Sequence, residues 1–285
     1  MPSPPDMASP STTASADYAK RHPIETLGRV GYAAKGVVYA LLGVLALNAA
    51  FGAGDPEGQD GALQAVAGTS YGPFLLWVLV VGLAAYGLWR FALAALDPEH
   101  KGDDAEGIVH RVGYVISGVA YLALAYTAYG IVTGGSGGGA GGGSGSTEER
   151  TQTLLGLPGG RWIVGAIALG VFGYGVYQFV RAYKASFMEK LRLEGEAARN
   201  REWVRRAGRA GLAARGVVYV LVGTFLGQAA LQRDADEAGG LDAALTALQG
   251  QGYGPWLLAL VALGLVLYGA YCGVNAAYRR YEGAQ

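Results

Sequence analysis

The chain has 285 residues, of which 52% are hydrophobic and only 15% are charged, and its formal net charge is zero. This composition is apolar-rich and charge-poor for a soluble protein, so it favours an integral membrane protein. A net charge of zero gives no electrostatic argument for nucleic-acid binding. A single cysteine, Cys272, excludes an intrachain disulfide and a Cys-rich metal site, and the three histidines lack metal-ligand spacing.

Residues 1–26 are rich in Pro, Ser, Thr and Ala and lack the apolar stretch of a secretory signal. We expect them to form a disordered cytosolic tail. Six apolar stretches follow, each long enough for a helix to cross a hydrocarbon core of about 30 Å. The predicted membrane helices cover residues 30–51, 73–96, 112–133, 162–183, 210–231 and 255–277.

One phrase occurs three times along the chain. The sequence GRVGYAAKGVVY at residues 28–39 recurs as GRAGLAARGVVY at 208–219 and, more loosely, as HRVGYVISGVAY at 110–121. Each copy opens a pair of apolar stretches, so all three copies enter the membrane in the same direction, related by an axis along its normal. We predict an all-α membrane fold of three parallel two-helix repeats, at residues 27–97, 98–184 and 208–282, with pseudo-threefold packing.

The connections between the spans differ in charge. Those on the side of the termini carry most of the basic residues, namely Lys20, Arg21, Arg29, Lys101, Arg111, Lys184, Lys190, Arg192, Arg199, Arg201, Arg205, Arg206, Arg209, Arg279 and Arg280. The opposite side has only Arg150, Arg161 and Arg233. The positive-inside rule therefore predicts a multi-pass plasma-membrane protein whose termini are both cytoplasmic.

Two connections have unusual composition. Residues 134–146 are almost pure Gly and Ser, and we interpret them as a flexible insertion in the outer loop of the middle copy, where the first and third copies have a short amphipathic helix. Residues 185–207 form a basic linker. Two interpretations of this linker stay open: a basic amphipathic element on the anionic inner leaflet, or a solvated segment that enforces topology.

Small residues recur at fixed places in the first helix of each copy. They lie about two turns apart on one stripe and comprise Gly36, Gly43, Gly118, Gly216 and Gly223. Membrane helices use such residues to approach one another closely, so we assign them to helix packing. The second helices repeat a Tyr-Gly pair, which we also assign to packing.

A layer of polar residues lies near the cytoplasmic ends of the spans. It contains three cations, Lys35, Arg90 and Arg215, while Ser117, Gln178 and Cys272 stand at the equivalent places in the other helices. None of the six spans contains Asp or Glu, so water, a lipid phosphate or an anionic ligand must solvate the cations. One interpretation is that the cations extend to the headgroups and enforce topology, and the other is an anion or anionic-lipid site.

Other polar residues could join such a site. Tyr39, Tyr121 and Tyr219 lie one turn further into the membrane, where their hydroxyls could meet a cation or bond across helices. We therefore name Tyr39, Ser117, Tyr121, Gln178 and Tyr219 as candidate polar partners of the cations.

At these residues the chain resembles the bacterial membrane proteins of the domain of unknown function 1206 family. The resemblance rests on the G-R-x-G-x-x-A-[KR]-G-x-x-Y opening and on the later Tyr-Gly-Pro and Tyr-Gly elements, and it covers about residues 27–282 without the glycine-rich insertion. The middle copy departs from the pattern, with Ser117 in place of the cation and no Tyr-Gly-Pro. The resemblance implies an integral plasma-membrane protein and supplies no known activity.

Two hypotheses of function follow. The first is a structural or interaction protein of the membrane that binds anionic lipids through its cations. The second is a small permease or channel in which Lys35, Arg90 and Arg215 line a pathway for an anionic solute. The sequence shows no nucleophile with a base, no phosphate-cradling loop and no cofactor or metal motif, so we expect no enzyme, no cofactor and no nucleic-acid partner. It leaves the oligomeric state open.

Overall fold

The computed structural model describes residues 12–96, 105–134, 144–193 and 195–279. These residues form ten α-helices: α1 (Thr12–Ala50), α2 (Gln59–Ala67), α3 (Gly72–Leu96), α4 (Ala105–Val132), α5 (Ser144–Leu155), α6 (Gly160–Lys184), α7 (Gly195–Arg199), α8 (Arg201–Gln232), α9 (Leu241–Gln249) and α10 (Gly254–Tyr278). Two 3₁₀ turns, η1 (Ser186–Lys190) and η2 (Ala235–Glu237), complete the described part, which contains no strand.

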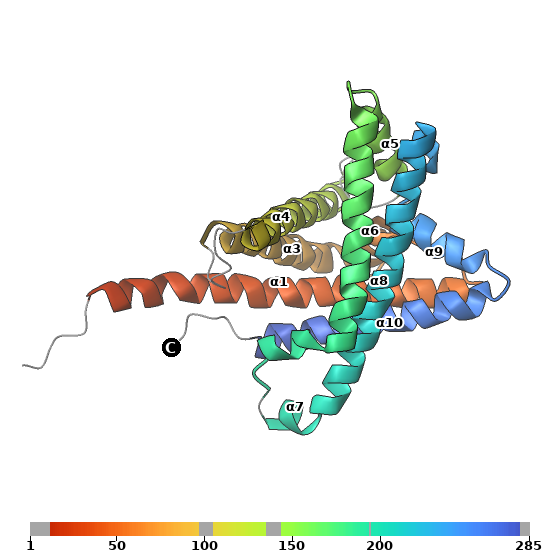
Figure 1. Cartoon of the computed structure of the whole chain (residues 1–285). Coiled ribbons are helices and arrows are strands. Elements are labelled where there is room, and N and C mark those ends of the chain that lie inside the picture. The colour runs from red at the N-terminus through yellow and green to blue at the C-terminus, as the bar shows by residue number, and fades with distance from the viewer. Residues whose placement is uncertain (1–11, 97–104, 135–143, 194, 280–285) are drawn as a thin grey trace, which may run out of the picture.

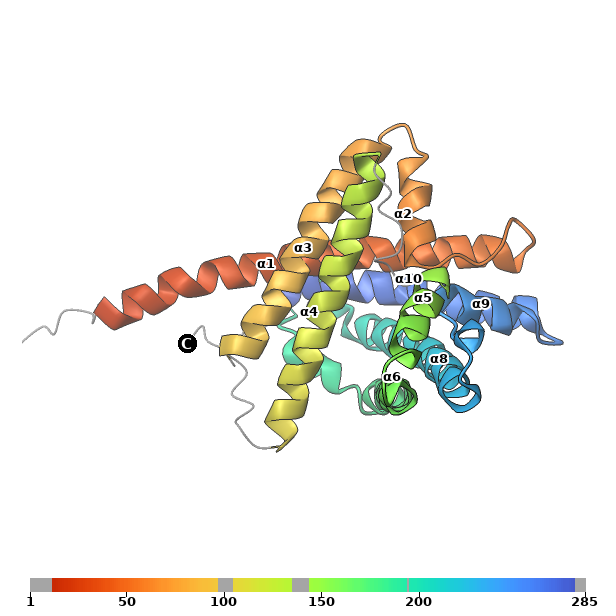
Figure 2. The same ribbon diagram turned by 90° about the horizontal axis from the view of Figure 1, so that it is seen from above.

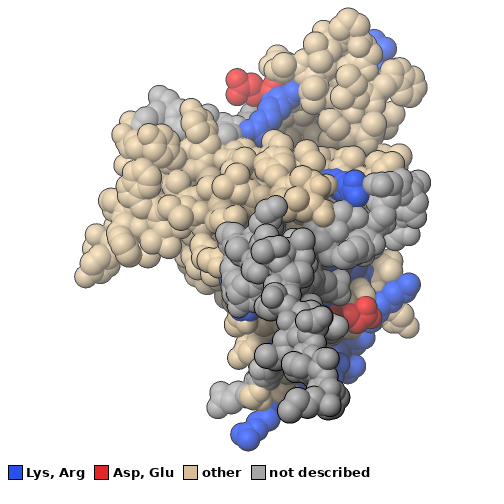
Figure 3. Space-filling model, turned by 90° about the vertical axis from the view of Figure 1, so that its left-hand side faces the viewer, with Lys and Arg blue, Asp and Glu red and all other residues tan. Residues whose placement is uncertain are grey.

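The six predicted membrane helices are confirmed as α1, α3, α4, α6, α8 and α10, each of which is long and apolar enough to cross a bilayer. The apolar side chains on the surface agree with contact to lipid, since Phe74, Val81, Leu169 and Leu260 are all more than half exposed. Figure 3 shows wide uncharged areas between the few Lys, Arg, Asp and Glu side chains in view.

The ends of the elements differ from the prediction at three places. Helix α1 starts at Thr12, so residues 12–26 of the expected disordered tail are helical, and their Ala and Lys residues are good helix formers. Residues 1–11 and 135–143 lie outside the described part. Helix α5 starts at Ser144, so the middle copy also has a short helix on the side of α2 and α9, and residues 144–146 of the predicted Gly/Ser insertion belong to it.

The predicted basic linker is the third difference. Its first part folds back onto the protein: Phe187 of η1 is buried and packs edge-to-face on Tyr271, with ring centroids 5.1 Å apart. The backbone N–H of Arg192 donates a hydrogen bond of 2.7 Å to the carbonyl of Tyr278. Residues 201–207 then belong to α8. The first part of the predicted linker is therefore docked on the end of α10.

The three copies pack in a closed cycle. The second helix of each copy lies along the first helix of the next, so α3 packs on α4, α6 on α8, and α10 on α1. In Figures 1 and 2 these three pairs run in different directions and cross near the middle of the molecule. The cycle is the arrangement that pseudo-threefold symmetry requires, because the same contact joins copy one to two, two to three and three to one.

Equivalent glycines form the closest contacts of this cycle. Gly36 lies on Gly269, Gly118 on Gly87, and Gly216 on Gly175, so each pair joins a first helix to the second helix of the preceding copy. A methyl group added at Gly36 would come 2.9 Å from the carbonyl oxygen of Gly269, closer than side-chain carbons approach. Gly43 and Gly223 extend two of these interfaces, against Val266 and Phe172.

The middle copy lacks the contact that the other two copies make between their own helices. In the first copy α1 packs on α3, with Gly31 against the backbone of Tyr86, and in the third copy α8 packs on α10, with Gly211 against Tyr268. In the middle copy the equivalent Gly113 of α4 has no atom within 4 Å of an added Cβ, and the same holds for Gly170 of α6.

A bulky residue in the middle copy explains why α4 and α6 are separated. The glycines equivalent to Gly170 in the other copies, Gly82 and Gly264, receive the methyl groups of Ala34 and Ala214. The middle copy has Ile116 at that position, and Ile116 is 63% exposed. The contact has room for a methyl group but not for a branched butyl side chain, so α4 and α6 do not close on each other.

Candidate functional site

Two of the predicted cations lie inside the bundle. Lys35 comes from α1 and Arg215 from α8, and their side chains are only 3% and 5% exposed. Each lies one residue before the glycine of a close helix contact, Gly36 or Gly216, so its direction is fixed by the packing of the helix. Neither cation extends along the surface towards the membrane boundary as the snorkelling interpretation requires.

Six tyrosines surround the place where the copies meet, one from the first helix and one from the second helix of each copy. They form three edge-to-face pairs, each between the first helix of one copy and the second helix of the preceding copy. The ring centroids are 4.8 Å apart in Tyr39–Tyr268, 4.5 Å in Tyr86–Tyr121 and 5.0 Å in Tyr174–Tyr219. Tyr39, Tyr121 and Tyr219 were expected here from the sequence, whereas their partners were assigned only to packing.

Lys35 is held by two of these tyrosine pairs. Its ammonium group donates a hydrogen bond of 3.2 Å to the hydroxyl of Tyr86. The same nitrogen lies 4.8 Å from the ring centroid of Tyr86, 4.9 Å from that of Tyr121, 5.6 Å from that of Tyr268 and 5.9 Å from that of Tyr39. These distances are within the range of cation–π attraction.

Arg215 shares two of those rings. Its Nη1 donates a hydrogen bond of 2.6 Å to the hydroxyl of Tyr268, and its Nη2 donates one of 2.6 Å to the hydroxyl of Tyr219. The guanidinium carbon lies 4.4 Å from the Tyr268 ring centroid and 5.1 Å from that of Tyr39. Lys35 and Arg215 therefore meet at the Tyr39–Tyr268 pair, and we call these two cations with the six tyrosines the cation–tyrosine centre.

The third predicted cation, Arg90, lies at the edge of this centre. It is half-buried, and its Nη2 donates a hydrogen bond of 2.6 Å to the hydroxyl of Tyr86, the same oxygen that Lys35 approaches. Its guanidinium also lies 5.3 Å from the rings of Trp89 and Tyr114. Arg90 thus joins the centre through Tyr86 rather than by entering it.

The two predicted polar partners that are not tyrosines, Ser117 and Gln178, differ from each other. Ser117 is half-buried, and the structure gives it no polar contact at the centre. Gln178 of α6 is 0% exposed, and neither its amide nitrogen nor its amide oxygen has a hydrogen-bond partner among the described residues. Buried polar atoms are normally paired, so Gln178 has unused hydrogen-bonding capacity at the level of the cations.

The positive charges of the centre have no negative counterpart among the described residues. No described carboxylate forms an ion pair with Lys35 or Arg215, and the six apolar stretches predicted from the sequence contain no Asp or Glu. Tyrosine hydroxyls and ring faces supply only dipoles and quadrupoles, and a desolvated cation–π contact contributes about 2 kcal/mol. The Nε of Arg215 is also buried without a hydrogen-bond partner in the described part of the chain. The centre therefore contains two buried cations that no described carboxylate neutralises.

The arginine of the repeated phrase has a structural role that the sequence does not reveal. Nη1 of Arg29 donates hydrogen bonds of 3.1 Å and 2.6 Å to the carbonyls of Ala276 and Ala277, and Nη2 of Arg209 donates one of 2.8 Å to the carbonyl of Tyr183. These acceptors are at the C-terminal ends of α10 and α6, where a cation stabilises the helix dipole. From the sequence alone, these arginines are explained equally well as charges that set the orientation of the helices in the membrane.

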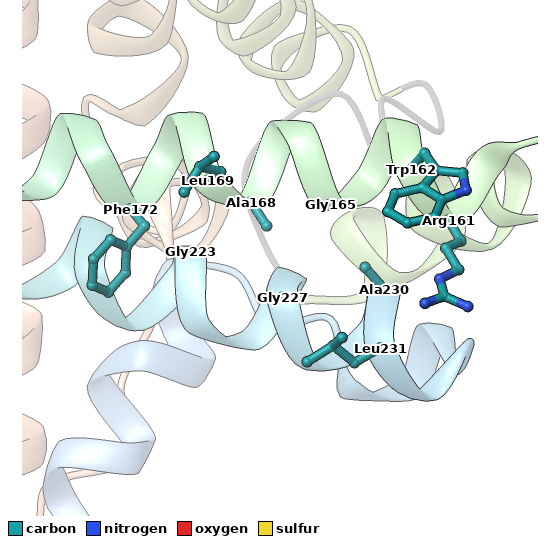
Figure 4. Close-up of a pocket in the computed structure, with 10 residues that line it drawn as sticks. All are labelled: Arg161, Trp162, Gly165, Ala168, Leu169, Phe172, Gly223, Gly227, Ala230 and Leu231. Carbon is teal, nitrogen blue, oxygen red and sulfur yellow. The ribbon is translucent and has the colours of Figure 1, made fainter.

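Two hollows lie elsewhere on the molecule. The first, of about 310 Å³, is an apolar groove between the N-terminal half of α6 and the C-terminal part of α8, lined by Gly165, Phe172 and Gly223 among others, with Arg161 and Trp162 at one end (Figure 4). The second lies near α7 and contains Arg199 and Arg205. Neither includes Lys35 or Arg215. The described residues contain no group of three or more His, Cys, Asp or Glu side chains suited to a metal.

Comparison with known proteins identifies the repeat. A family model described as Domain of Unknown Function (DUF1206) matches residues 30–97, 112–185 and 210–279, one match for each copy. The chain is 34% identical over 262 residues to the uncharacterized protein YxxB of Bacillus subtilis (strain 168), and the alignment covers 90% of this chain and 91% of that protein. No solved structure matches. The chain therefore belongs to the DUF1206 family of proteins, with three copies of the domain.

Proposed function

We propose that the protein binds an anion at the cation–tyrosine centre, inside a cytoplasmic membrane whose inner face carries both termini. The observation that carries the proposal is the convergence of two buried cations, Lys35 and Arg215, on shared tyrosine rings, with no ion pair to a carboxylate among the described residues. Ionisable groups inside a membrane are costly and usually serve a ligand or an ion pathway.

The donors at the centre suit an anion of modest size. The Lys35 ammonium and the unpaired Nε–H of Arg215 can each donate to an anionic oxygen, and charge-assisted hydrogen bonds of this kind are stronger than those between neutral groups. The tyrosine hydroxyls that Arg215 already bonds hold its guanidinium in place. The proposal assigns no chemical reaction to these residues.

The orientation and lipid partners form part of the proposal. Arg199, Arg201, Arg205 and Arg206 are exposed close to the start of α8, and such a basic cluster favours the inner, anionic face of the membrane. Under this orientation the centre is closer to the cytoplasmic than to the outer boundary. Anionic lipid headgroups would then contact this cluster.

Thermal unfolding of the purified protein tests anion binding. We expect chloride, phosphate or acetate to raise the unfolding temperature in a concentration-dependent manner, because a ligand that binds only the folded state stabilises it. The matched variants are Lys35→Met, which removes a buried cation, and Arg206→Met, which removes an exposed one. If all three anions shift the parent, Lys35→Met and Arg206→Met equally, or shift none of them, the proposal fails.

A structural protein is the second candidate, and the hydrogen bonds of the centre favour it. In that case the tyrosines alone stabilise Lys35 and Arg215, and the charges hold the three copies together. Anion flux into proteoliposomes separates a permease from both alternatives. Flux that Lys35→Met abolishes would identify a permease, whereas anion binding without flux would identify a binding protein.

A further inference from the structure

The separation of α4 from α6 leaves one side of the bundle different from the other two. Tyr174 of α6 is 40% exposed, whereas its equivalents Tyr86 and Tyr268 are 0% and 4% exposed. The next aromatic position repeats the difference, because Trp89 and Tyr271 are buried and Tyr177 is 46% exposed. The cation–tyrosine centre is therefore closed by helix contacts in the first and third copies, and its outermost tyrosine is accessible at the middle copy.

The opening lies between apolar walls. On α4 it is bordered by Ile116, which is 63% exposed where its equivalent Ala34 is 7% exposed, and on α6 by Gly170, which has open space beside it. Contact of such an apolar surface with water is unfavourable, whereas its contact with the hydrocarbon chains of the membrane is favourable. The opening thus connects an uncompensated positive centre with the apolar interior of the bilayer.

We propose that the ligand of the centre is a single-chain amphiphile with a carboxylate head, and that it enters sideways from the membrane between α4 and α6. This inference rests on the proposed anion binding. The charge of the head complements Lys35 and Arg215, and the chain complements the apolar walls. A carboxylate fits the donors, since its two oxygens can take the Lys35 ammonium and the Nε–H of Arg215.

Gln178 of α6 supplies a further buried donor for the head of such a ligand. It belongs to α6, the helix that borders the opening, and it is one turn from Tyr174. Its amide nitrogen can donate to a carboxylate oxygen, and both of its polar side-chain atoms lack a partner in the described part of the chain. The equivalent residue of the third copy is Cys272, which is buried and packs beside Gly36.

A photoreactive fatty acid of about sixteen carbons, bearing a diazirine in its chain, tests the inference on the full-length protein in nanodiscs. We expect crosslinks on α4 and α6 at the residues bordering Gly113 and Gly170. The variant Gly170→Leu places a bulky side chain in the opening, at a position where nothing lies within 4 Å of an added Cβ. It should reduce labelling at least tenfold. Gly273→Leu, at another uncrowded glycine of a second helix, should leave labelling unchanged.

A short carboxylate separates this inference from the function on which it rests. Trifluoroacetate has the head without the chain, so it should bind the parent and Gly170→Leu alike and fail to bind Lys35→Met. If trifluoroacetate binds as expected but Gly170→Leu labels as strongly as the parent, the sideways entry is wrong and anion binding stands. Labelling by a diazirine phospholipid, but not by the fatty acid, would overturn the choice of a single-chain carboxylate. If Lys35→Met retains the binding of both probes, the proposed function itself fails.

Discussion

Gly36 of α1 lies against Gly269 of α10, and this contact joins the first copy to the third and closes the ring of three. We predict that Gly36→Leu destabilises the protein, because even a methyl group there would come 2.9 Å from the Gly269 carbonyl oxygen. Overpacking of this kind costs about 1–3 kcal/mol. Gly113→Leu is the matched control, since Gly113 has open space. Equal losses of unfolding temperature for both variants would contradict the packing of the cycle.

Lys35→Met should not destabilise the anion-free protein. The substitution removes an uncompensated charge and keeps a side chain of similar length, and Tyr86 still receives the hydrogen bonds of Arg90. Replacement of buried charges by apolar groups is often neutral or stabilising, by about 1–4 kcal/mol. Chemical unfolding in mild detergent, with anions removed by dialysis, measures the difference.

Arg215→Met provides the contrast. It also removes a buried charge, but it leaves the hydroxyls of Tyr219 and Tyr268 without the donor that each has in the parent. We expect this variant to be less stable than Lys35→Met by about 1–3 kcal/mol, because Tyr268 is only 4% exposed and a buried hydroxyl without its donor carries such a cost. Equal stability of the two variants would show that the hydrogen bonds of Arg215 do not support the centre.

Arg29→Ala should weaken the end of α10. Its guanidinium bonds the carbonyls of Ala276 and Ala277, and a cation at a helix C-terminus contributes about 0.3–1 kcal/mol. Hydrogen exchange of the last turn of α10 should become faster. Arg206→Ala, which removes an exposed pair with Glu202, serves as control and should leave that exchange unchanged. If hydrogen exchange at the end of α10 is unchanged in Arg29→Ala, Arg29 does not stabilise that end of the helix.

The opening depends on one bulky residue. Ile116→Ala gives the middle copy the alanine that contacts glycine in the first and third copies, so α4 and α6 should approach each other. Val119 and Val176 are exposed on these helices and can carry spin labels. Double electron–electron resonance should then give a shorter distance between the two labels. The same labels with Ile167→Ala, an exposed isoleucine outside the contact, should report the parent distance.

Much of the fold follows from the sequence. Apolar length gave the six membrane helices to within a few residues at most ends, and the repeated phrase predicted three parallel units. The glycines of that phrase, such as Gly36 and Gly216, indicated close packing before their partners were known. These features are local or periodic, so a single sequence contains them.

The direction of the cations could not be predicted in the same way. Successive side chains on a helix point in directions about 100° apart. Whether Lys35 and Arg215 point inward therefore depends on which face each helix buries. The tyrosines of the second helices, Tyr86 and Tyr268, stand beside glycines in the sequence, a pattern that indicates packing and does not reveal the cations they contact. The open middle copy had a signal in Ile116, but its meaning required the contact of Ala34 with Gly82.

The most direct test of anion binding at the cation–tyrosine centre is the fluorine NMR line width of trifluoroacetate with the purified protein. We predict broadening with the parent and with Arg206→Met, and loss of broadening when Lys35→Met and Arg215→Met are combined, provided that circular dichroism shows the double variant to be helical. Equal broadening with the parent and the folded double variant would contradict the account, because the anion would then bind without the two buried cations.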